Sequence, residues 1–304
     1  MSGSWIAGSV RARLLVAERR AGPDAAAEIA AAGSLRDALV VLSRTPYRRG
    51  ARLGLELADA ERAVLDTTLL HLRLLLGWLP ADAHGLLRTL AAWFELANAE
   101  DRVGYLAGAR LRRPFELGGL AVAWPRAAGA QTLDELTRAL SGSAWTELDP
   151  HSGAELGLAL RLAWARRVAA EVPEARPWAL GAAALLLAGE LYVVGLPVER
   201  LAVPELPLLG AAWQDARTFE QLKHSLPPEA AWALADADTP AELWRAEARW
   251  WETVEREAGG LLRSGVAGQA VVTGAVALLA ADAHRLVTAL ELAARGGGEL
   301  DVAA

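Results

Sequence analysis

The sequence predicts an all-α protein built from three similar helical repeat domains. Its apolar residues are mostly alanine and leucine, which favour helix, and we find no convincing alternation of apolar and polar residues that would indicate a strand. A short phrase also recurs three times: SLRDALVVLSRTPY from Ser34, TLDELTRALSGSAW from Thr132 and TFEQLKHSLPPEAAW from Thr218. Recurrence at long and nearly equal intervals predicts three copies of one small helical domain.

Each copy of the phrase predicts a short capped helix. It opens with Ser or Thr and has an acidic or amide side chain three residues later, which is the pattern of a capping box. Apolar residues then follow at helical spacing, and a short break leads to an aromatic residue. The apolar positions are Leu35, Ala38 and Leu42, then Leu133, Leu136 and Leu140, then Phe219, Leu222 and Leu226; the aromatic residues are Tyr47, Trp145 and Trp232.

A longer helix is expected after each capped helix, beginning at a Glu-Leu pair. The pairs are Glu56-Leu57, Glu155-Leu156 and Glu242-Leu243, at nearly the same distance from their caps. A further helix pair is expected at 86–111 and at 269–296, where Asn98 and Asp282 lie equally far from their caps. The middle copy has only Glu190 in this region, and Gly195 and Pro197 are expected to end or kink its helix.

These patterns set the predicted domain boundaries. Residues 34–131, 132–217 and 218–304 form repeats 1, 2 and 3. Residues 1–33 form an N-terminal helix that resembles the last helix of the unit and completes a repeat. Loops with Gly and Pro at 114–129 and 197–210 separate the repeats.

Composition narrows the class of protein. A net charge of −6 does not favour nucleic-acid binding, and the absence of cysteine excludes disulfides and thiolate chemistry, which fits a cytoplasmic protein. The first residues do not have the pattern of a signal peptide. Two apolar stretches, 178–196 and 266–287, are long enough to be tested as membrane spans. Because they contain Glu190 and Asp282, we predict buried helices, with membrane insertion as the alternative.

No catalytic constellation is recognised in the sequence. The five histidines form no metal-ligand motif, and there is no P-loop, no nucleophile elbow and no dinucleotide-binding glycine pattern. His284, which lies between Asp282 and Arg285, is expected to be solvated or locally bonded. We therefore expect no catalytic residue, no cofactor and no metal.

Arginine clusters give the candidate partner-docking residues, which are Arg11, Arg13, Arg102, Arg110, Arg112, Arg113 and Arg285. The alternative is a solvated face in which arginine near a helix C-terminus is favoured by the helix dipole. The twelve tryptophans, against three Phe and three Tyr, are expected to pack in the core or to anchor an interface.

Four segments, taken in order, resemble a known family. They are SWIAGSVRARLL, LRDALVVLSRTPY, FELANAEDRVGYLAGARLRRPFE and GVAGQAVVTGAVALLAADAHRLVTALELAARG. The chain is similar over nearly its whole length to the central-stalk cap of V/A-type rotary ATPases, the C-type subunit of prokaryotes and the d-type subunit of eukaryotes. It departs from that family in the middle repeat and in having Lys223 as its only lysine.

The resemblance implies a funnel-like arrangement of three all-α domains on the cytoplasmic face of the membrane. Such a protein joins the central shaft to the ring of proteolipid subunits and couples ATP turnover to ion transport mechanically, without a cofactor. Its membrane association is peripheral and goes through protein partners. Two other functions stay open. The second hypothesis is a stand-alone helical-repeat adaptor, and the third is an α-helical enzyme with a cavity between repeats.

Overall fold

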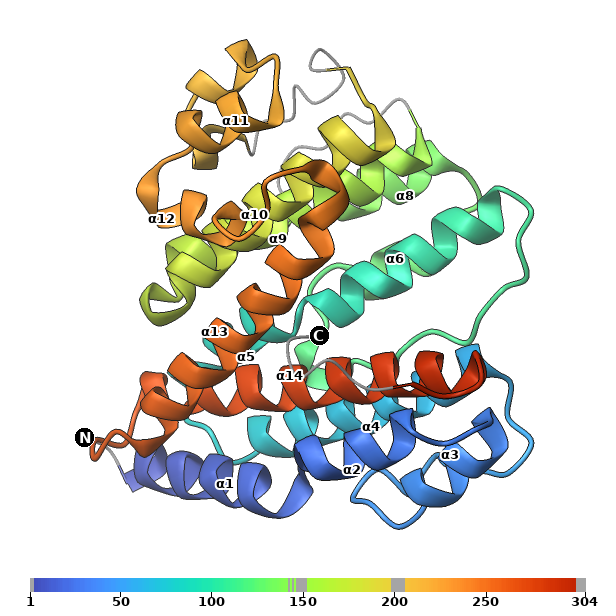
Figure 1. Ribbon diagram of the computed structural model, residues 1–304. Helices are drawn as coiled ribbons and strands as arrows, with labels where there is room; N and C mark the ends of the chain where they lie inside the picture. Colours follow the sequence, from blue (N-terminus) through green and yellow to red (C-terminus); the bar gives the residue numbers. More distant parts are fainter. Residues whose placement is uncertain (1–2, 142, 144, 146–151, 198–205, 299–304) are drawn as a thin grey trace. The chain divides into compact units, whose positions relative to one another are not determined.

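The computed structural model describes residues 3–141, 143, 145, 152–197 and 206–298. The described residues are mostly helical and contain no strand, so the predicted all-α class is confirmed (Figure 1). The chain divides into two compact units. Unit 1 contains residues 1–87 and 251–304, and unit 2 contains residues 88–250. The three predicted repeats do not coincide with these units and stay a prediction.

Unit 1 packs helices from both ends of the chain around α14. Its helices are α1 (Gly3–Arg19), α2 (Gly22–Ala30), α3 (Leu35–Leu42), α4 (Leu57–Leu76), the 3₁₀ turn η1 (Ala81–Ala83) and α14 (Gln269–Ala294). Helix α14 contacts α1, α2, α3 and α4. The N-terminal segment, expected to be one helix, is two, because Gly22 has a positive φ of 80° and Pro23 follows it.

Unit 2 is formed by the middle of the chain. Its α-helices are α6 (Trp93–Leu106), α7 (Trp124–Ala127), α8 (Leu133–Leu140), α9 (Gly153–Glu171), α10 (Arg176–Gly189), α11 (Phe219–Ser225) and α12 (Pro228–Ala231). Its short turns are η2 (Gly118–Leu120), η3 (Pro173–Ala175), η4 (Glu190–Val194), η6 (Leu206–Leu209), η7 (Ala212–Asp215), η8 (Trp232–Leu234) and η9 (Pro240–Glu242). The division between the units falls within α5 (His84–Ala91) and α13 (Leu243–Arg263).

All three predicted caps are confirmed. The Ser34 and Thr132 hydroxyls accept from the amides of Asp37 and Glu135, at 3.2 and 3.1 Å, at the start of α3 and α8. The Thr218 hydroxyl accepts from the amide of Gln221 at 3.2 Å at the start of α11. Each cap satisfies an amide that has no partner within its own helix, so the helices begin where the phrase predicts.

The longer helices also begin at the predicted Glu-Leu pairs. Helix α4 starts at Leu57, α9 at Gly153 just before its pair, and α13 at Leu243, with lengths of 20, 19 and 21 residues. The same order of elements therefore occurs three times along the chain. A short helix or turn (α2, α7, η7) is followed by a capped helix (α3, α8, α11) and then a long helix (α4, α9, α13), although α12, η8 and η9 stand between the last two in the third copy.

Three hydrophobic clusters follow this recurrence. The first joins α2, α3, α4 and α14 in unit 1, around Ile29, Leu42 and Leu286. In unit 2, one cluster joins α6, α7, α8 and α9 around Leu136, and another joins α9 and α10 to η7 and α11 around Trp213. Each capped helix thus buries its apolar face in the same cluster as the short helix or turn that precedes it.

The loop at 114–129 belongs to the core of unit 2, although its Gly and Pro content predicts a boundary. Phe115, Leu117 and Leu120 are almost fully buried, and the loop carries the short helix α7. In the middle copy, α10 continues through a π-helical turn and ends at Gly195, whose φ is 78°. The predicted interruption at Gly195 is therefore confirmed.

Two helical stretches, Pro173–Val194 and Gln269–Ala294, are long and apolar enough to cross a membrane by length and composition alone. In the second, 67% of the most apolar window is buried inside the protein, and Asp282 on the same helix is buried too. Such burial is typical of a core helix packed on all sides by other helices.

A close approach of α13 and α14 in unit 1 supplies a stability test. A Cβ added at Gly274 would lie 2.6 Å from the Ala258 carbonyl oxygen and 3.0 Å from the Leu261 Cβ. Because backbone stands in the way, we expect Gly274→Ala to lower the free energy of unfolding by about 1–3 kcal/mol in urea denaturation. Gly85→Ala, where the added Cβ meets nothing within 4 Å, is the control. It should leave stability unchanged or raise it by about 0.5 kcal/mol, and equal losses in both variants would contradict the close packing.

Candidate docking residues and buried carboxylates

Arg13, Arg102 and Arg285, three of the seven predicted docking arginines, are buried or half-buried and bond within their own unit. In unit 1, Arg13 donates to the carbonyl oxygens of Leu262 (3.1 Å) and Ser264 (2.6 Å), at the end of α13. In unit 2, Arg102 is 8% exposed and its Nε donates to the Ala130 oxygen at 2.7 Å. Arg285 pairs with Glu255 in unit 1. These cations hold helix ends and loops in place.

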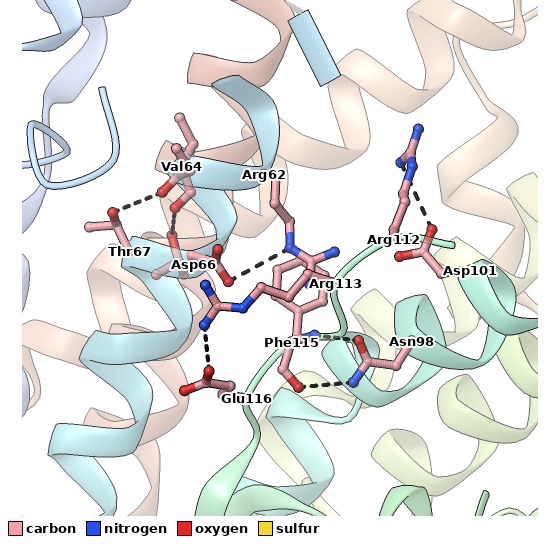
Figure 2. A network of polar contacts seen from close by, with 12 residues as sticks. Arg62, Val64, Asp66, Thr67, Asn98, Asp101, Arg112, Arg113, Phe115 and Glu116 are labelled. Atoms are coloured by element: carbon pink, nitrogen blue, oxygen red, sulfur yellow. Dashed lines mark hydrogen bonds and ion pairs between the residues drawn. The ribbon is translucent and has the colours of Figure 1, made fainter. Parts of the chain in front are cut away.

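Arg110, Arg112 and Arg113 lie together on the exposed loop that follows α6. The guanidinium of Arg112 is 3.8 Å from Asp101, and Arg113 forms an ion pair with Glu116, as Figure 2 shows. All three side chains keep much of their surface in water, and surface pairs of this kind contribute little to stability. The loop is therefore the part of the predicted docking set that a partner could contact directly.

Arg11 in unit 1 is half-buried. Its guanidinium carbon lies 5.9 Å from the centre of the Trp78 ring, within the range of a cation–π contact. Its Nε is buried and has no hydrogen-bond partner among the described residues. Trp78 itself is 52% exposed, whereas Trp213 is buried in the core as predicted for most tryptophans.

The acidic residue that organises unit 2 is Glu95, one helical turn before the Asn98 that sequence spacing indicated. Glu95 is 1% exposed, and its Oε1 accepts from the amides of Val122 (3.2 Å), Ala123 (2.7 Å) and Trp124 at the start of α7. A carboxylate at a helix start meets both unpaired amides and the positive end of the helix dipole. Glu95 therefore caps a helix to which it does not belong.

Asp282 does the same in unit 1. It is 1% exposed, and its two oxygens accept from the amides of Ala21 (2.8 Å) and Gly22 (2.9 Å), where α2 begins. In both units a carboxylate on a longer helix thus caps the short helix that precedes a Ser- or Thr-capped one. Spacing from the caps predicted Asp282 as a marked position but missed Glu95, because helix lengths differ between the copies.

Asn98 has a separate structural role in unit 2. Its Nδ2 donates to the Phe115 carbonyl oxygen at 3.0 Å, and its Oδ1 accepts from the Phe115 amide at 2.6 Å (Figure 2). This two-point bond satisfies both backbone groups of a buried residue in the 114–129 loop. It also brings the Phe115 ring against Phe94, with ring centres 5.0 Å apart.

The aromatic residue at the end of the recurring phrase lies next to the carboxylate in both units. In unit 2, Trp145 Nε1 donates to Glu95 Oε2 at 3.3 Å. In unit 1, Tyr47 is fully buried, and burial, together with the charge of Asp282, raises the pKa of Tyr47 well above its usual value. Tyr47 is therefore a neutral hydroxyl at all physiological pH values.

An ionic network extends from Asp282 in unit 1. Glu255 on α13 forms ion pairs with both Arg20 and Arg285, and Arg20 Nε lies 3.8 Å from Asp282. Burial alone would raise the pKa of Glu255, but the hydrogen bond from Arg285 and the charges of both arginines outweigh it and lower that pKa. Arg20 lies in the short connection between α1 and α2, so the network ties this connection to α13 and α14. The charges involved are partly shielded from water.

His284 is locally held, as the sequence predicts. Its ring stacks on Trp251 with centres 4.4 Å apart and an interplanar angle of 14°. Burial, and next the positive charge of Arg285, lower the pKa of His284 to about 4. The imidazole is therefore neutral at pH 7 and serves packing in unit 1.

Among the described residues, no group of three or more His, Cys, Asp or Glu side chains is placed to hold a metal ion. The two oxygens of Asp282 accept from backbone amides, and those of Glu95 accept from backbone amides and from the Trp145 indole. No known family model matches the sequence, and no curated protein matches it significantly.

Removing the charge of Asp282 tests its capping role. In Asp282→Asn one oxygen becomes an NH₂ group that cannot accept, so one of the two amides at Ala21 and Gly22 loses its partner. Because a buried donor is left unpaired, we expect a loss of about 2–4 kcal/mol in the free energy of unfolding. Asp59→Asn, at an exposed position, should cost less than about 0.5 kcal/mol. A loss of that small size in Asp282→Asn would refute the role.

His284 gives unfolding a dependence on pH. Its pKa is lower in the folded state than the ordinary 6.5, so the unfolded chain binds the proton more tightly. The stabilisation is complete above pH 6.5 and is lost as the pH falls toward 4. Between pH 7 and 5 we expect His284 to account for about 2 kcal/mol of lost stability.

His284→Gln should therefore weaken the fall in stability between pH 7 and 5, measured by urea denaturation at both values. His224→Gln, at an exposed histidine, should leave that fall unchanged. An identical pH dependence in the wild type and His284→Gln would show that the histidine titrates alike in both states.

Proposed function

We propose that the protein is a non-catalytic coupling subunit of a V/A-type rotary ATPase or ATP synthase. In this role it links the central shaft to the membrane proteolipid ring and so couples ATP turnover to ion transport. The observation that carries the proposal is the threefold recurrence of a short helix or turn, a capped helix and a long helix, each with its own hydrophobic cluster. The proposal also rests on the four segments that resemble the central-stalk cap of these enzymes, which contain α1, α3, α6 and α14 in whole or in part.

Mechanical coupling requires elements that keep their geometry under load. Two features of the described residues support such rigidity. Buried carboxylates on α6 and α14 hold the start of α7 and α2, and Arg13 and Arg102 hold a helix end and a loop. Because bonds of this kind are directional and shielded from water, they resist small displacements.

The proposed docking contact in unit 2 is the loop with Arg110, Arg112 and Arg113. Arginine forms bidentate bonds with carboxylates, so this loop suits an acidic surface on the shaft or the ring. We propose that these contacts place the protein on the cytoplasmic face of the membrane as a peripheral component, held through protein partners and without a cofactor.

A stand-alone helical-repeat adaptor is the second candidate. It would have the same threefold order of helices as a coupling subunit. Genomic context distinguishes the candidates cheaply: a coupling subunit should be encoded beside other parts of a rotary ATPase, whereas an adaptor need not be. A catalytic role is a third reading and would require a cluster of convergent ionisable side chains.

Affinity purification from the native organism tests the proposal. The tagged full chain, purified from gently solubilised membranes, should bring down a coiled-coil shaft protein and a proteolipid, both identified by mass spectrometry. Recovery of neither in a preparation that contains an intact rotary ATPase would refute the coupling role. Recovery of other soluble partners would support the adaptor.

The docking loop can be tested in the same purification. We expect Arg110→Gln/Arg112→Gln/Arg113→Gln to reduce partner recovery at least several-fold, because three cations are removed from one exposed loop. The matched control, Arg126→Gln/Arg138→Gln/Arg217→Gln, removes three exposed arginines elsewhere in unit 2. Equal recovery from the two variants would place docking on another surface.

A further inference from the structure

A pocket in unit 1 combines an arginine-rich wall with a buried imidazole. Its volume is about 540 Å³, and it is lined by residues of α1, of α4 and of the segment after α3. Arg11 and Arg19 contribute from α1, His71 from α4, and Arg44, Arg48 and Arg49 from the segment after α3. The lining residues are 11, 15, 18 and 19 on α1 and 67, 70, 71 and 74 on α4, a helical spacing that turns one face of each helix to the pocket.

The charge of this pocket is opposite to that of the chain. Five arginines face it, against Glu18 as the one carboxylate in the lining. The protein as a whole has a net charge of −6. Within the described part of the chain, no carboxylate pairs with any of the five guanidinium groups. Because like charges gathered in one concavity repel each other, such a lining is stabilised when an anion occupies it.

Two residues that line the pocket carry buried polar atoms without hydrogen-bond partners. Arg11 Nε and His71 Nδ1 are both buried, and neither has a hydrogen-bond partner among the described residues. Burial, followed by the charges of Arg19 and Arg11, lowers the pKa of His71 to about 4. Buried polar atoms without partners are uncommon in folded proteins and are typical of places where a ligand or water completes the bonding.

We infer that this pocket binds a ligand with two or more neighbouring phosphate groups. Its volume falls within the range of small-molecule sites. Arginine presents a planar fork of donors that matches phosphate oxygens, and a lining in which five arginines outnumber one carboxylate calls for several negative charges close together. Leu15, Leu70 and Leu74 add apolar lining that can contact the rest of the ligand.

The inference concerns binding alone and does not depend on the coupling role. Two sources could supply clustered phosphates: a soluble diphosphate or nucleotide, and a phospholipid headgroup. The second must be distinguished because Ile6, Val10 and Leu14 form an exposed apolar stripe along α1, the helix that also supplies Arg11 and Arg19 to the pocket.

Calorimetric titration of the full-length protein at about 0.15 M salt, where the charges of the surface are screened, tests the site. Pyrophosphate, ATP and inorganic phosphate are the soluble probes, and flotation with cardiolipin vesicles, against phosphatidylcholine vesicles, is the lipid arm. We expect saturable binding of one equivalent of pyrophosphate or ATP, or binding to cardiolipin alone, with inorganic phosphate at least tenfold weaker than the diphosphate.

Matched variants separate the pocket from general charge effects. Arg44→Gln/Arg48→Gln should weaken binding at least tenfold, because both arginines line the pocket. Arg36→Gln/Arg73→Gln removes the same charge at exposed positions of unit 1 outside it and should bind as the wild type does. Circular dichroism of both variants verifies that they are folded.

Three results would overturn the inference. They are no binding of any phosphate probe at the same salt concentration, equal weakening in the two double variants, and tighter binding of a poly-glutamate peptide than of pyrophosphate. The last result would identify the pocket as a docking site for an acidic protein segment.

Discussion

Buried carboxylates that accept backbone amides are the interaction on which both units depend. Glu95 and Asp282 are each 1% exposed and close the first turn of a helix distant from them in sequence. A buried carboxylate is costly unless its oxygens are bonded, and the unpaired amides of a helix start are costly unless they find acceptors. Each group thus removes the other's penalty, so the position of the short helix is fixed relative to the longer one.

The rest of each unit is arranged around these contacts. The aromatic residue of the recurring phrase packs beside the carboxylate, as Tyr47 in unit 1 and Trp145 in unit 2. The cluster around Trp213 differs: α10, which packs in it, ends in a π-helical turn with Glu190, whose side chain is only half-buried.

Local features could be predicted from the sequence, and distant ones could not. The caps at Ser34, Thr132 and Thr218 depend on residues three positions apart, so the pattern alone located three helix starts. The bond between Asp282 and Gly22 joins residues 260 positions apart, and no local pattern reports it. Arg13 and Arg102 were predicted as docking residues on charge alone, because their carbonyl acceptors leave no trace in side-chain sequence.

The composition of unit 1 from both ends of the chain has a consequence for synthesis on the ribosome. Helices α1 to α4 are made before unit 2, but α14, against which they bury their apolar faces, is made after it. Until then α2 lacks its carboxylate, and Ile29 and Leu42 lack the cluster that shields them from water. Unit 2 is continuous and can fold while the chain is still growing. The nascent protein thus passes through a stage in which unit 2 can already be folded while the first helices of unit 1 still expose apolar surface. Protection from aggregation matters most at that stage.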